Sequence, residues 1–322
     1  MSEIFLDKDI DLKIIQQKKI SIIGYGNQGR AQALNLRDSG INIRIGLRIN
    51  SNSIPAVKKD NLKYLEIQES VIWADIICLL VPDKKIPEVF KEYIKENLNS
   101  NKTILFSHGF NIHYKQIEVS NENDVIMVAP SAGGKIVRSE YKKGYGVPSL
   151  IAVHNDASGS AFELAKAYAK AIGSGRVCIF KSTFKEETET DIFGEQAILT
   201  GGLPFLINQS FNTLVEKGYS PIVAWFVCYY EIKTIVDLFH DIGFEEFYDK
   251  ISDTARIGGI LSGSKLIDDS FVEKLKSLLE DIESGSFYKR LSEEQDKKIP
   301  NSFKKIDEQT KFFFKIIRKL RN

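Results

Sequence analysis

The first half of the chain alternates short apolar runs with amphipathic segments. The apolar runs occupy residues 19–23, 41–47, 74–82, 103–107, 125–129, 149–153 and 177–180. Helical patterns over residues 27–39, 86–98 and 159–172 separate several of these runs. Because apolar runs that alternate with helices are typical of βαβ units, the pattern predicts a doubly wound, mostly parallel α/β sheet.

The second half carries helical patterns only. Long helices are predicted over residues 191–217 and 221–242, which contain little glycine or proline. Residues 221–239 are nearly all apolar, the main exceptions being Glu231, Lys233 and Asp237, and a helix that is apolar all round is expected to be buried. The chain is therefore predicted to form a Rossmann domain over residues 1–182 and an all-helical domain over 183–322. A helical half this apolar indicates an intimate homodimer.

A glycine-rich turn joins the first predicted strand to the first helix. It reads Gly24-Tyr25-Gly26-Asn27-Gln28-Gly29, directly after the run 19–23. In this strand–turn–helix context the glycines permit a tight turn, and the start of the helix offers free N–H groups to a pyrophosphate. The turn predicts dinucleotide binding.

The end of the next strand indicates which dinucleotide binds. An NAD site usually has an acidic residue there, but residues 46–53 contain none. Arg48, Ser51 and Ser53 suit a 2′-phosphate instead, because a guanidinium binds phosphate bidentately. We therefore expect NADPH, and the alternative is an ordinary polar loop. Pro82, His108 and Ser131 lie at other strand ends, where ligands of such sheets bind.

The segment 181–202 concentrates acidic side chains at the start of a helix. Asp191 and Glu195 are four residues apart, so their carboxylates are expected on one face, a spacing that suits Mg²⁺. The alternative is that an acidic first turn only favours the helix dipole, and Glu186 and Glu187 are assigned this role alone. Glu231 is a further candidate ligand, and its alternative is a buried ion pair with a lysine.

Composition and charge argue against several classes of protein. The chain has 322 residues and a net charge of +1, which argues against a dedicated nucleic-acid surface. It contains no run of 18 apolar residues and no basic-then-apolar leader, so neither a membrane span nor a secretory signal is expected. The cysteines at 78, 178 and 228 stand among apolar residues, which indicates buried thiols in a reducing compartment. We expect a cytoplasmic protein.

Several long motifs resemble the ketol-acid reductoisomerase family, in its short form with one helical domain. They are GYGNQGRAQALNLRDSG, WADIICLLVPD, HGFNIHY, GVPSLIAVHNDASG, TFKEETETDIFGEQ and DIESGSF, and the resemblance covers nearly the whole chain. It implies a Rossmann domain followed by a knotted helical domain, and dimers whose active sites use both subunits. It also implies NADPH or NADH, Mg²⁺, and the conversion of 2-acetolactate-type acids to 2,3-dihydroxy acids by an alkyl shift and a hydride transfer.

The resemblance assigns roles by position. Cofactor contacts are expected at Gly24, Tyr25, Gly26, Asn27, Gln28, Gly29, Arg48, Ser51, Ser53, Pro82, His108 and Gly134. Catalytic roles fall on His108, Asp191, Glu195 and Glu231, and the last three are the expected Mg²⁺ ligands, Glu231 from the partner subunit. Substrate contacts are expected at Glu231, Ser252 and Ala255.

The departures from the family pattern concern the catalytic pocket. The family's lysine beside the metals is Ser131 here, and its first glutamate on the apolar helix is Val227. The family's ISNTAEYG reads ISDTARIG, with Arg256 and Ile257 replacing an acid and a tyrosine. With one carboxylate lost, one Mg²⁺ is expected and a second metal site is expected to be weak or absent.

Three functional hypotheses follow. The leading one is an active paralogue redirected to specialised metabolism, through rearrangement, reduction or cyclopropanol-type ring formation on a small hydroxy or keto acid. The second is an authentic reductoisomerase that makes 2,3-dihydroxyisovalerate for branched-chain amino acid synthesis. The third is a non-catalytic NADPH-binding protein.

Overall fold

The chain divides into two compact units in a computed structural model that describes residues 3–293 and 298–320. The first unit is Met1–Thr188 and the second is Glu189–Asn322. Each unit has its own core, and each is described by itself.

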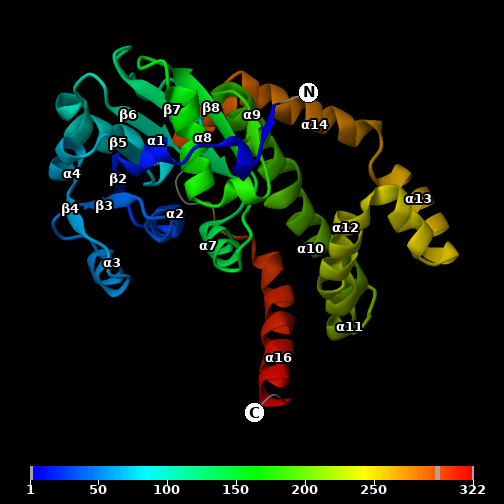
Figure 1. The fold of residues 1–322 in the computed structure, drawn as a ribbon. Helices are drawn as coiled ribbons and strands as arrows, with labels where there is room; N and C mark the ends of the chain where they lie inside the picture. The colour runs from blue at the N-terminus through cyan, green and yellow to red at the C-terminus, as the bar shows by residue number, and fades with distance from the viewer. Residues whose placement is uncertain (1–2, 294–297, 321–322) are drawn as a thin grey trace. The chain divides into compact units, whose positions relative to one another are not determined.

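A sheet with the order β1-β9-β8-β7-β6-β5-β2-β3-β4 forms the centre of the first unit (Figure 1). Its strands are β1 (Ile4–Phe5), β2 (Lys19–Ile23), β3 (Asn42–Leu47), β4 (Tyr64–Glu66), β5 (Ile76–Leu79), β6 (Thr103–Phe106), β7 (Asp124–Pro130), β8 (Ser149–Asn155) and β9 (Ile179–Lys181). Neighbouring strands are parallel except in the β7–β8 and β1–β9 pairs. The predicted doubly wound, mostly parallel sheet is confirmed.

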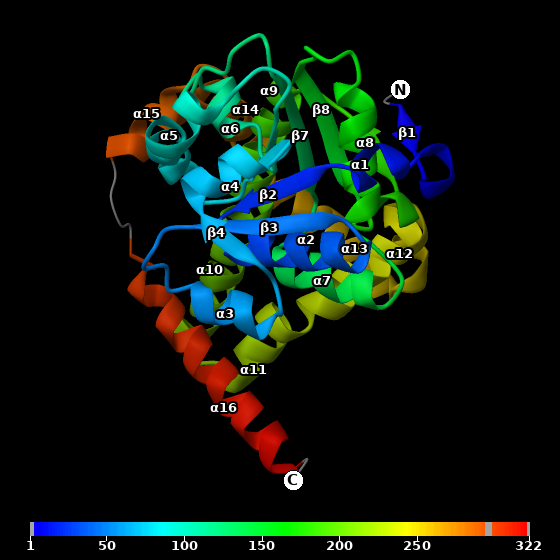
Figure 2. The same ribbon diagram turned by 60° about the vertical axis from the view of Figure 1, so that its left-hand side comes forward.

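Helices cover both faces of this sheet (Figure 2). The helices of this part of the chain are α1 (Lys13–Gln16), α2 (Asn27–Asp38), α3 (Ile54–Lys59), α4 (Ile67–Trp73), α5 (Ile86–Val89), α6 (Phe110–His113), α7 (Gly134–Lys142), α8 (Ala161–Ala171) and the start of α9 (Phe184–Gly194). One apolar core joins the sheet to α2 and α8, and the other joins it to α4 and α5. The loops that follow the strand ends thus lie between two well-packed layers.

The second unit consists of helices joined by short turns and loops, with no strand in its described residues. It continues from α9 into a π-helical turn, Glu195–Leu199, and then α10 (Gly202–Glu216), α11 (Pro221–Trp225), a second π-helical turn, Phe226–Tyr230, α12 (Ile232–Lys250), α13 (Asp253–Leu266), α14 (Asp269–Glu283), α15 (Ser286–Glu293) and α16 (Lys304–Leu320). Its core gathers Phe211, Trp225 and Ile306 from α10, α11 and α16. The predicted all-helical C-terminal domain is confirmed.

Two predicted helices are interrupted. Within the predicted helix 191–217, the first α-helix ends at Gly194 and a π-helical turn follows. In this turn the Thr200 N–H donates to the Glu195 carbonyl at 2.8 Å. In the predicted helix 221–242, the Glu231 N–H likewise donates to the Phe226 carbonyl at 3.1 Å. The bonds span five residues instead of four, which widens the helix locally, and residue types alone do not predict such turns.

The prediction that residues 221–239 are buried is wrong for the single chain. Ala224 and Trp225 are buried, but Val223, Phe226 and Val227 are 56%, 43% and 47% exposed. The reason is geometric: α10 and α16 pack against α11, which leaves most of this segment's apolar circumference without a covering layer.

Two further expectations can be compared with the structure. Within the described residues, no helix is both long enough and apolar enough to cross a membrane. Cys78 is fully buried, which raises the pKa of its thiol to about 12, whereas Cys178 and Cys228 are only half-buried.

Candidate functional site

A cavity of about 460 Å³ opens beyond the carboxyl ends of β2, β3 and β5. Its lining includes several of the positions predicted to bind the cofactor, namely Gly24, Tyr25, Gly26, Arg48, Ser51, Ser53 and Pro82. Parallel strands bring these positions together although they are spread over nearly 60 residues of sequence. The volume and position suit part of a dinucleotide.

The glycine-rich turn is as tight as its sequence predicts. Gly24 has φ +100°, and a Cβ there would meet Val81 Cγ1 at 2.8 Å. A Cβ on Gly29 would lie 2.5 Å from the Gly24 carbonyl oxygen. Gly26, by contrast, has no atom within 4 Å of an added Cβ, so it leaves open space beside the start of α2. This arrangement fits a pyrophosphate held by backbone N–H groups.

The far side of the cavity carries charges of both signs, from Arg48 and Lys85 and from Glu88 and Glu92. Arg48 follows β3, and the Ser53 N–H donates to Ser51 Oγ at 3.2 Å, which shapes the polar loop. Lys85 also lines the cavity and pairs with Glu88 at 2.9 Å. The sequence analysis missed Lys85, although it lies only three residues after Pro82. The Arg48 and Lys85 side chains fit a 2′-phosphate.

Three predicted cofactor positions lie elsewhere around the turn. Asn27 and Gly134 line a separate cleft between α2 and α7, and a Cβ on Gly134 would lie 2.0 Å from the Asn27 carbonyl oxygen. The Gln28 side chain donates to the Ala132 carbonyl at 2.8 Å. In this structure all three join the glycine-rich turn to the loop after β7.

A buried polar network runs from this turn to the end of β6. Gln32 Nε2 donates to Ser107 Oγ at 2.9 Å and to Gln28 Oε1 at 3.1 Å, and the Tyr168 hydroxyl donates to Gln32 Oε1 at 2.9 Å. Gln32 and Tyr168 are fully buried. Since Ser107 precedes His108, the network holds the glycine-rich turn and the histidine loop in fixed relation.

His108 is paired with a buried carboxylate. Its Nδ1 lies 2.8 Å from Glu187 Oε1, and the Gly109 N–H donates to Glu187 Oε2 at 2.7 Å. Glu187 is only 3% exposed. The interpretation of Glu187 as a residue that only favours the helix dipole was wrong, because its side chain turns inward and holds the histidine loop. The available signal was its position four residues before Asp191.

The acidic face of α9 therefore begins one turn earlier than predicted. Glu187 and Asp191 both lie on α9, with a ligand atom of each within 4.8 Å of the other. Asp191 is exposed, and Glu195 opens the π-helical turn, so the Asp191–Glu195 spacing crosses a change of helix type. Carboxylate oxygens on neighbouring turns fit a hard cation such as Mg²⁺.

The remaining predicted positions lie in the second unit. Glu231 is exposed and follows the second π-helical turn, and Lys233 pairs with Asp237, so the alternative of a buried Glu231–lysine pair is wrong. Ser252 caps α13, where its hydroxyl accepts from the Ala255 N–H at 3.2 Å. A serine in this position fixes the start of the helix.

Comparisons with known proteins agree with one another. Residues 14–178 match the family model described as the NADPH-binding domain of acetohydroxy acid isomeroreductase, and residues 184–322 match the C-terminal domain of ketol-acid reductoisomerase. The chain is 47% identical over 300 residues to "Ketol-acid reductoisomerase (NADP(+))" of Beutenbergia cavernae, covering 93% of this chain and 88% of that protein.

The chain is also similar to a further named protein and to a solved structure. A protein of the same name from Campylobacter hominis is 49% identical over 286 residues, which cover 89% of this chain and 84% of that protein. A solved structure of an NADH-preferring ketol-acid reductoisomerase from an uncultured archaeon matches with a TM-score of 0.86 and 39% identity, covering 99% of this chain and 94% of that one.

Proposed function

Because the chain belongs to the ketol-acid reductoisomerase family, as its motifs predicted, we propose that it is a working enzyme whose reaction departs from the ordinary one. The family is one of NADP-dependent enzymes that combine isomerisation with reduction, and its cofactors are the predicted NADPH and Mg²⁺. The proposed reaction is a rearrangement, reduction or cyclopropanol-type ring formation on a small hydroxy or keto acid of specialised metabolism.

The observation that carries this proposal is a contrast between two sets of residues. The cofactor cavity keeps its glycine-rich turn and its cationic loop with Arg48. The pocket positions, however, read Ser131 and Val227 where the family pattern has a lysine and a glutamate. A cofactor site that is kept while reaction residues are altered favours a changed substrate over a lost activity.

The proposed chemistry gives each predicted residue a role. Arg48, Ser51 and Ser53 would bind the 2′-phosphate and so favour NADPH. Asp191, Glu195 and Glu231 would hold Mg²⁺, which when bound polarises a carbonyl and stabilises an alkoxide. The Glu187 carboxylate keeps the His108 ring oriented, so that its other nitrogen can exchange a proton with a bound acid.

Local geometry supports the ligand assignment. Glu195 begins one π-helical turn and Glu231 directly follows the other. Such turns are often found at functional sites, because they change the direction of a few side chains without ending the helix. Ser252 and Ala255, at the start of α13, would contact the substrate.

The exposed apolar segment supports a homodimer. Val223, Phe226, Val227 and Tyr230 are each more than 40% exposed on adjoining turns. A contiguous apolar surface of this kind marks an interaction site. A second copy of the chain would cover it and bring the partner subunit's Glu231 toward a shared active site. Size-exclusion chromatography with light scattering should report about twice the chain mass of 36.4 kDa.

The deciding experiment measures 2-acetolactate turnover with NADPH and Mg²⁺. We expect little turnover by the natural protein, and a gain of at least about tenfold in the Ser131→Lys/Val227→Glu double variant, since restored metal chemistry contributes several kcal/mol. The matched control is Ser120→Lys/Val272→Glu, which adds the same groups at exposed positions outside the pocket and the proposed dimer surface and should gain nothing. Rapid acetolactate turnover by the natural protein would overturn the proposal.

The second candidate is an authentic reductoisomerase, favoured by the names of relatives at 47–49% identity. It predicts rapid conversion of acetolactate by the unmodified protein and rescue of an isoleucine–valine auxotroph. Supplying 3-hydroxy-3-methyl-2-oxobutanoate, the product of the alkyl shift, separates the two chemical steps. A redirected enzyme that keeps only the reductase half would consume NADPH with this acid but not with acetolactate.

A further inference from the structure

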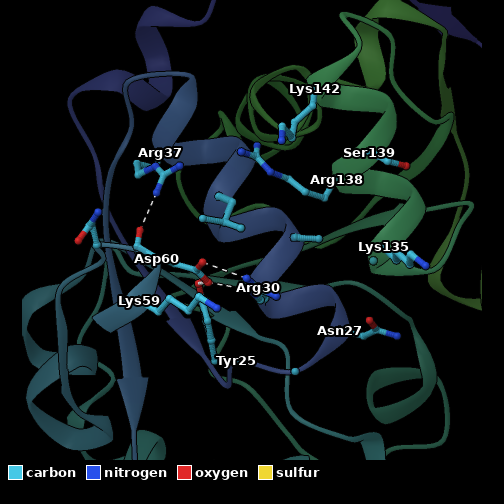
Figure 3. Close-up of a pocket in the computed structure, with 15 residues that line it drawn as sticks. Tyr25, Asn27, Arg30, Arg37, Lys59, Asp60, Lys135, Arg138, Ser139 and Lys142 are labelled. Carbon is cyan, nitrogen blue, oxygen red and sulfur yellow. Dashed lines mark hydrogen bonds and ion pairs between the residues drawn. The ribbon is translucent and has the colours of Figure 1, made fainter. Parts of the chain in front are cut away.

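A second cavity lies behind the glycine-rich turn, entirely within the first unit. Its volume is about 850 Å³, and α2, α7 and the end of α3 form its walls (Figure 3). It shares Tyr25 and Gly26 with the cofactor cavity but contains none of His108, Glu187 or the predicted metal ligands. We call it the α2–α7 cleft.

The lining of the α2–α7 cleft is strongly cationic. Six basic side chains and one carboxylate, Asp60, face it. The arginines are already engaged. Arg30 binds Asp60 through Nε at 2.6 Å and a second nitrogen at 2.9 Å. Arg37 and Arg138 share the carboxylate of Asp38, at 2.7 and 2.6 Å. These ion pairs hold the arginine side chains in place and neutralise most of their positive charge.

The lysines are not engaged in this way. Across residues 3–293 and 298–320, Lys59, Lys135 and Lys142 have no carboxylate within 4.0 Å, and all three are exposed. Lys59 comes from the end of α3, whereas Lys135 and Lys142 come from the first and last turns of α7 (Figure 3). The two α7 lysines are seven residues apart, which corresponds to about 10 Å along the helix.

Like charges gathered in a concave site raise the local concentration of anions. A single phosphate cannot reach both ends of a row about 10 Å long, but a chain of two or three phosphate groups can. Lysine binds phosphate as a point charge without demanding one geometry, which suits such a flexible ligand. We propose that the α2–α7 cleft binds a small free polyanion that carries two or more phosphate groups.

The site is separate from the cofactor cavity but shares a wall with it. The Tyr25 hydroxyl donates to Asp60 Oδ2 at 2.8 Å, so the residue between the two cavities is tied to the Arg30–Asp60 pair. The proposed ligand is distinct from NADPH because Lys59, Lys135 and Lys142 line the α2–α7 cleft and not the cofactor cavity. Its binding does not depend on the proposed reaction.

Isothermal titration of the full-length protein with tripolyphosphate, at saturating NADPH and low salt, tests the proposal. Saturating NADPH prevents the probe from binding in the cofactor cavity. We expect binding to the natural protein and much weaker binding of inorganic phosphate. The Lys59→Gln/Lys135→Gln/Lys142→Gln variant should lose at least about tenfold in affinity, because each exposed ion pair contributes a few-fold.

The matched control is Lys8→Gln/Lys18→Gln/Lys95→Gln, which removes the same charge from exposed positions outside the cleft. It should keep the natural affinity within about twofold, and NADPH affinity should be unchanged in both variants. Three results would each overturn the proposal. They are no binding of tripolyphosphate at saturating NADPH, an equal loss of affinity in the control variant, and a cleft variant that changes its oligomeric state but keeps its affinity for tripolyphosphate. Acetolactate turnover tests the proposed reaction separately.

Discussion

The carboxylate of Glu187 binds two successive residues at once: its Oε1 lies 2.8 Å from His108 Nδ1 and its Oε2 accepts from the Gly109 N–H at 2.7 Å. The helix that carries Glu187 also carries Asp191, one turn later. The orientation of the histidine is thus linked to the helix that holds a predicted metal ligand.

Replacing this carboxylate should impair turnover more than folding. We expect Glu187→Gln to lower kcat by about 10²-fold or more, because the amide cannot stabilise a protonated imidazole. NADPH affinity should remain, since Glu187 does not line the cofactor cavity. Steady-state kinetics and cofactor titration measure both. Glu186→Gln is the control, because Glu186 lies on the same helix but is exposed, and its Oε2 accepts a hydrogen bond from the nearby Ser182 hydroxyl at 2.7 Å. Equal losses in both variants would contradict the role of Glu187.

Arg48 should determine cofactor preference. Arg48→Glu places a negative charge where the 2′-phosphate is expected, so kcat/KM with NADPH should fall by about 10- to 100-fold, the value of a charge-assisted hydrogen bond. NADH lacks that phosphate and serves as the internal control, because its kcat/KM should change little. A parallel loss with NADH would show that Arg48 acts on folding instead.

Substitution of Gly26 tests whether NADPH occupies the open space beside α2. Gly26→Ala meets no atom within 4 Å and needs no positive φ, so the protein should stay folded. The added methyl should nevertheless weaken NADPH binding by about tenfold or more, since it occupies the approach to the pyrophosphate. Gly133→Ala is the control, because it is equally uncrowded and lies outside the cavity. Fluorescence titration with NADPH gives both dissociation constants, and identical values would refute the assignment.

The buried glutamine should matter for stability. Gln32→Leu leaves the Tyr168 hydroxyl, which is fully buried, without its acceptor, and this should cost about 1–3 kcal/mol of unfolding free energy. Thermal unfolding with and without NADPH measures the loss. Gln68→Leu, on the exposed face of α4, makes the same change where no buried partner depends on it. A Gln32 variant as stable as that control would contradict the network.

Asp60 gives the structure a defined pH dependence. The hydrogen bond from Arg30 is the main cause that lowers the pKa of Asp60 below its usual value. A carboxyl whose pKa is lower in the folded state stabilises that state above the unfolded pKa of about 4, and this contribution is lost as the pH falls through the folded pKa.

Asp60→Asn should therefore lower the free energy of unfolding at neutral pH. The fall in that free energy below about pH 4 should be smaller in the variant than in the natural protein. The loss should be about 1–2 kcal/mol, at the lower end for charged hydrogen bonds because Arg30 is half exposed. Unfolding curves collected from pH 3 to pH 7 measure the effect. Glu96→Gln, on an exposed helical turn, should leave the shape of the curve unchanged, and a similar flattening there would contradict the assignment to Asp60.

Much of the first unit could be predicted because local pattern and tertiary role agree there. The run 19–23 became β2 with identical bounds, and the glycine-rich turn adopted the conformation that its glycines predict. The antiparallel direction of β8 could not be predicted, because an apolar run such as 149–153 has no polarity of its own. Strand direction depends on the connection, which here passes through α7.

The site was less predictable, because single side chains there depend on distant partners. Glu187 is indistinguishable by residue type from Glu186, yet one is buried against His108 and the other is exposed. The residues that decide between them lie nearly 80 positions earlier in the chain. Lys85 was likewise missed because its place in the cofactor cavity depends on the path taken after β5.

The wide turn at Phe226–Tyr230 has a consequence for how related chains should be aligned. Across this turn the α-helical repeat of 3.6 residues does not identify which residues share a helix face. The four-residue spacing of Val227 and Glu231 therefore does not place them on one face. A π-helical turn takes up one residue more than an ordinary α-helical turn. A related chain that lacks one residue here would therefore form an ordinary turn, and its residues on either side would keep nearly the orientation that Phe226 and Glu231 have in this chain.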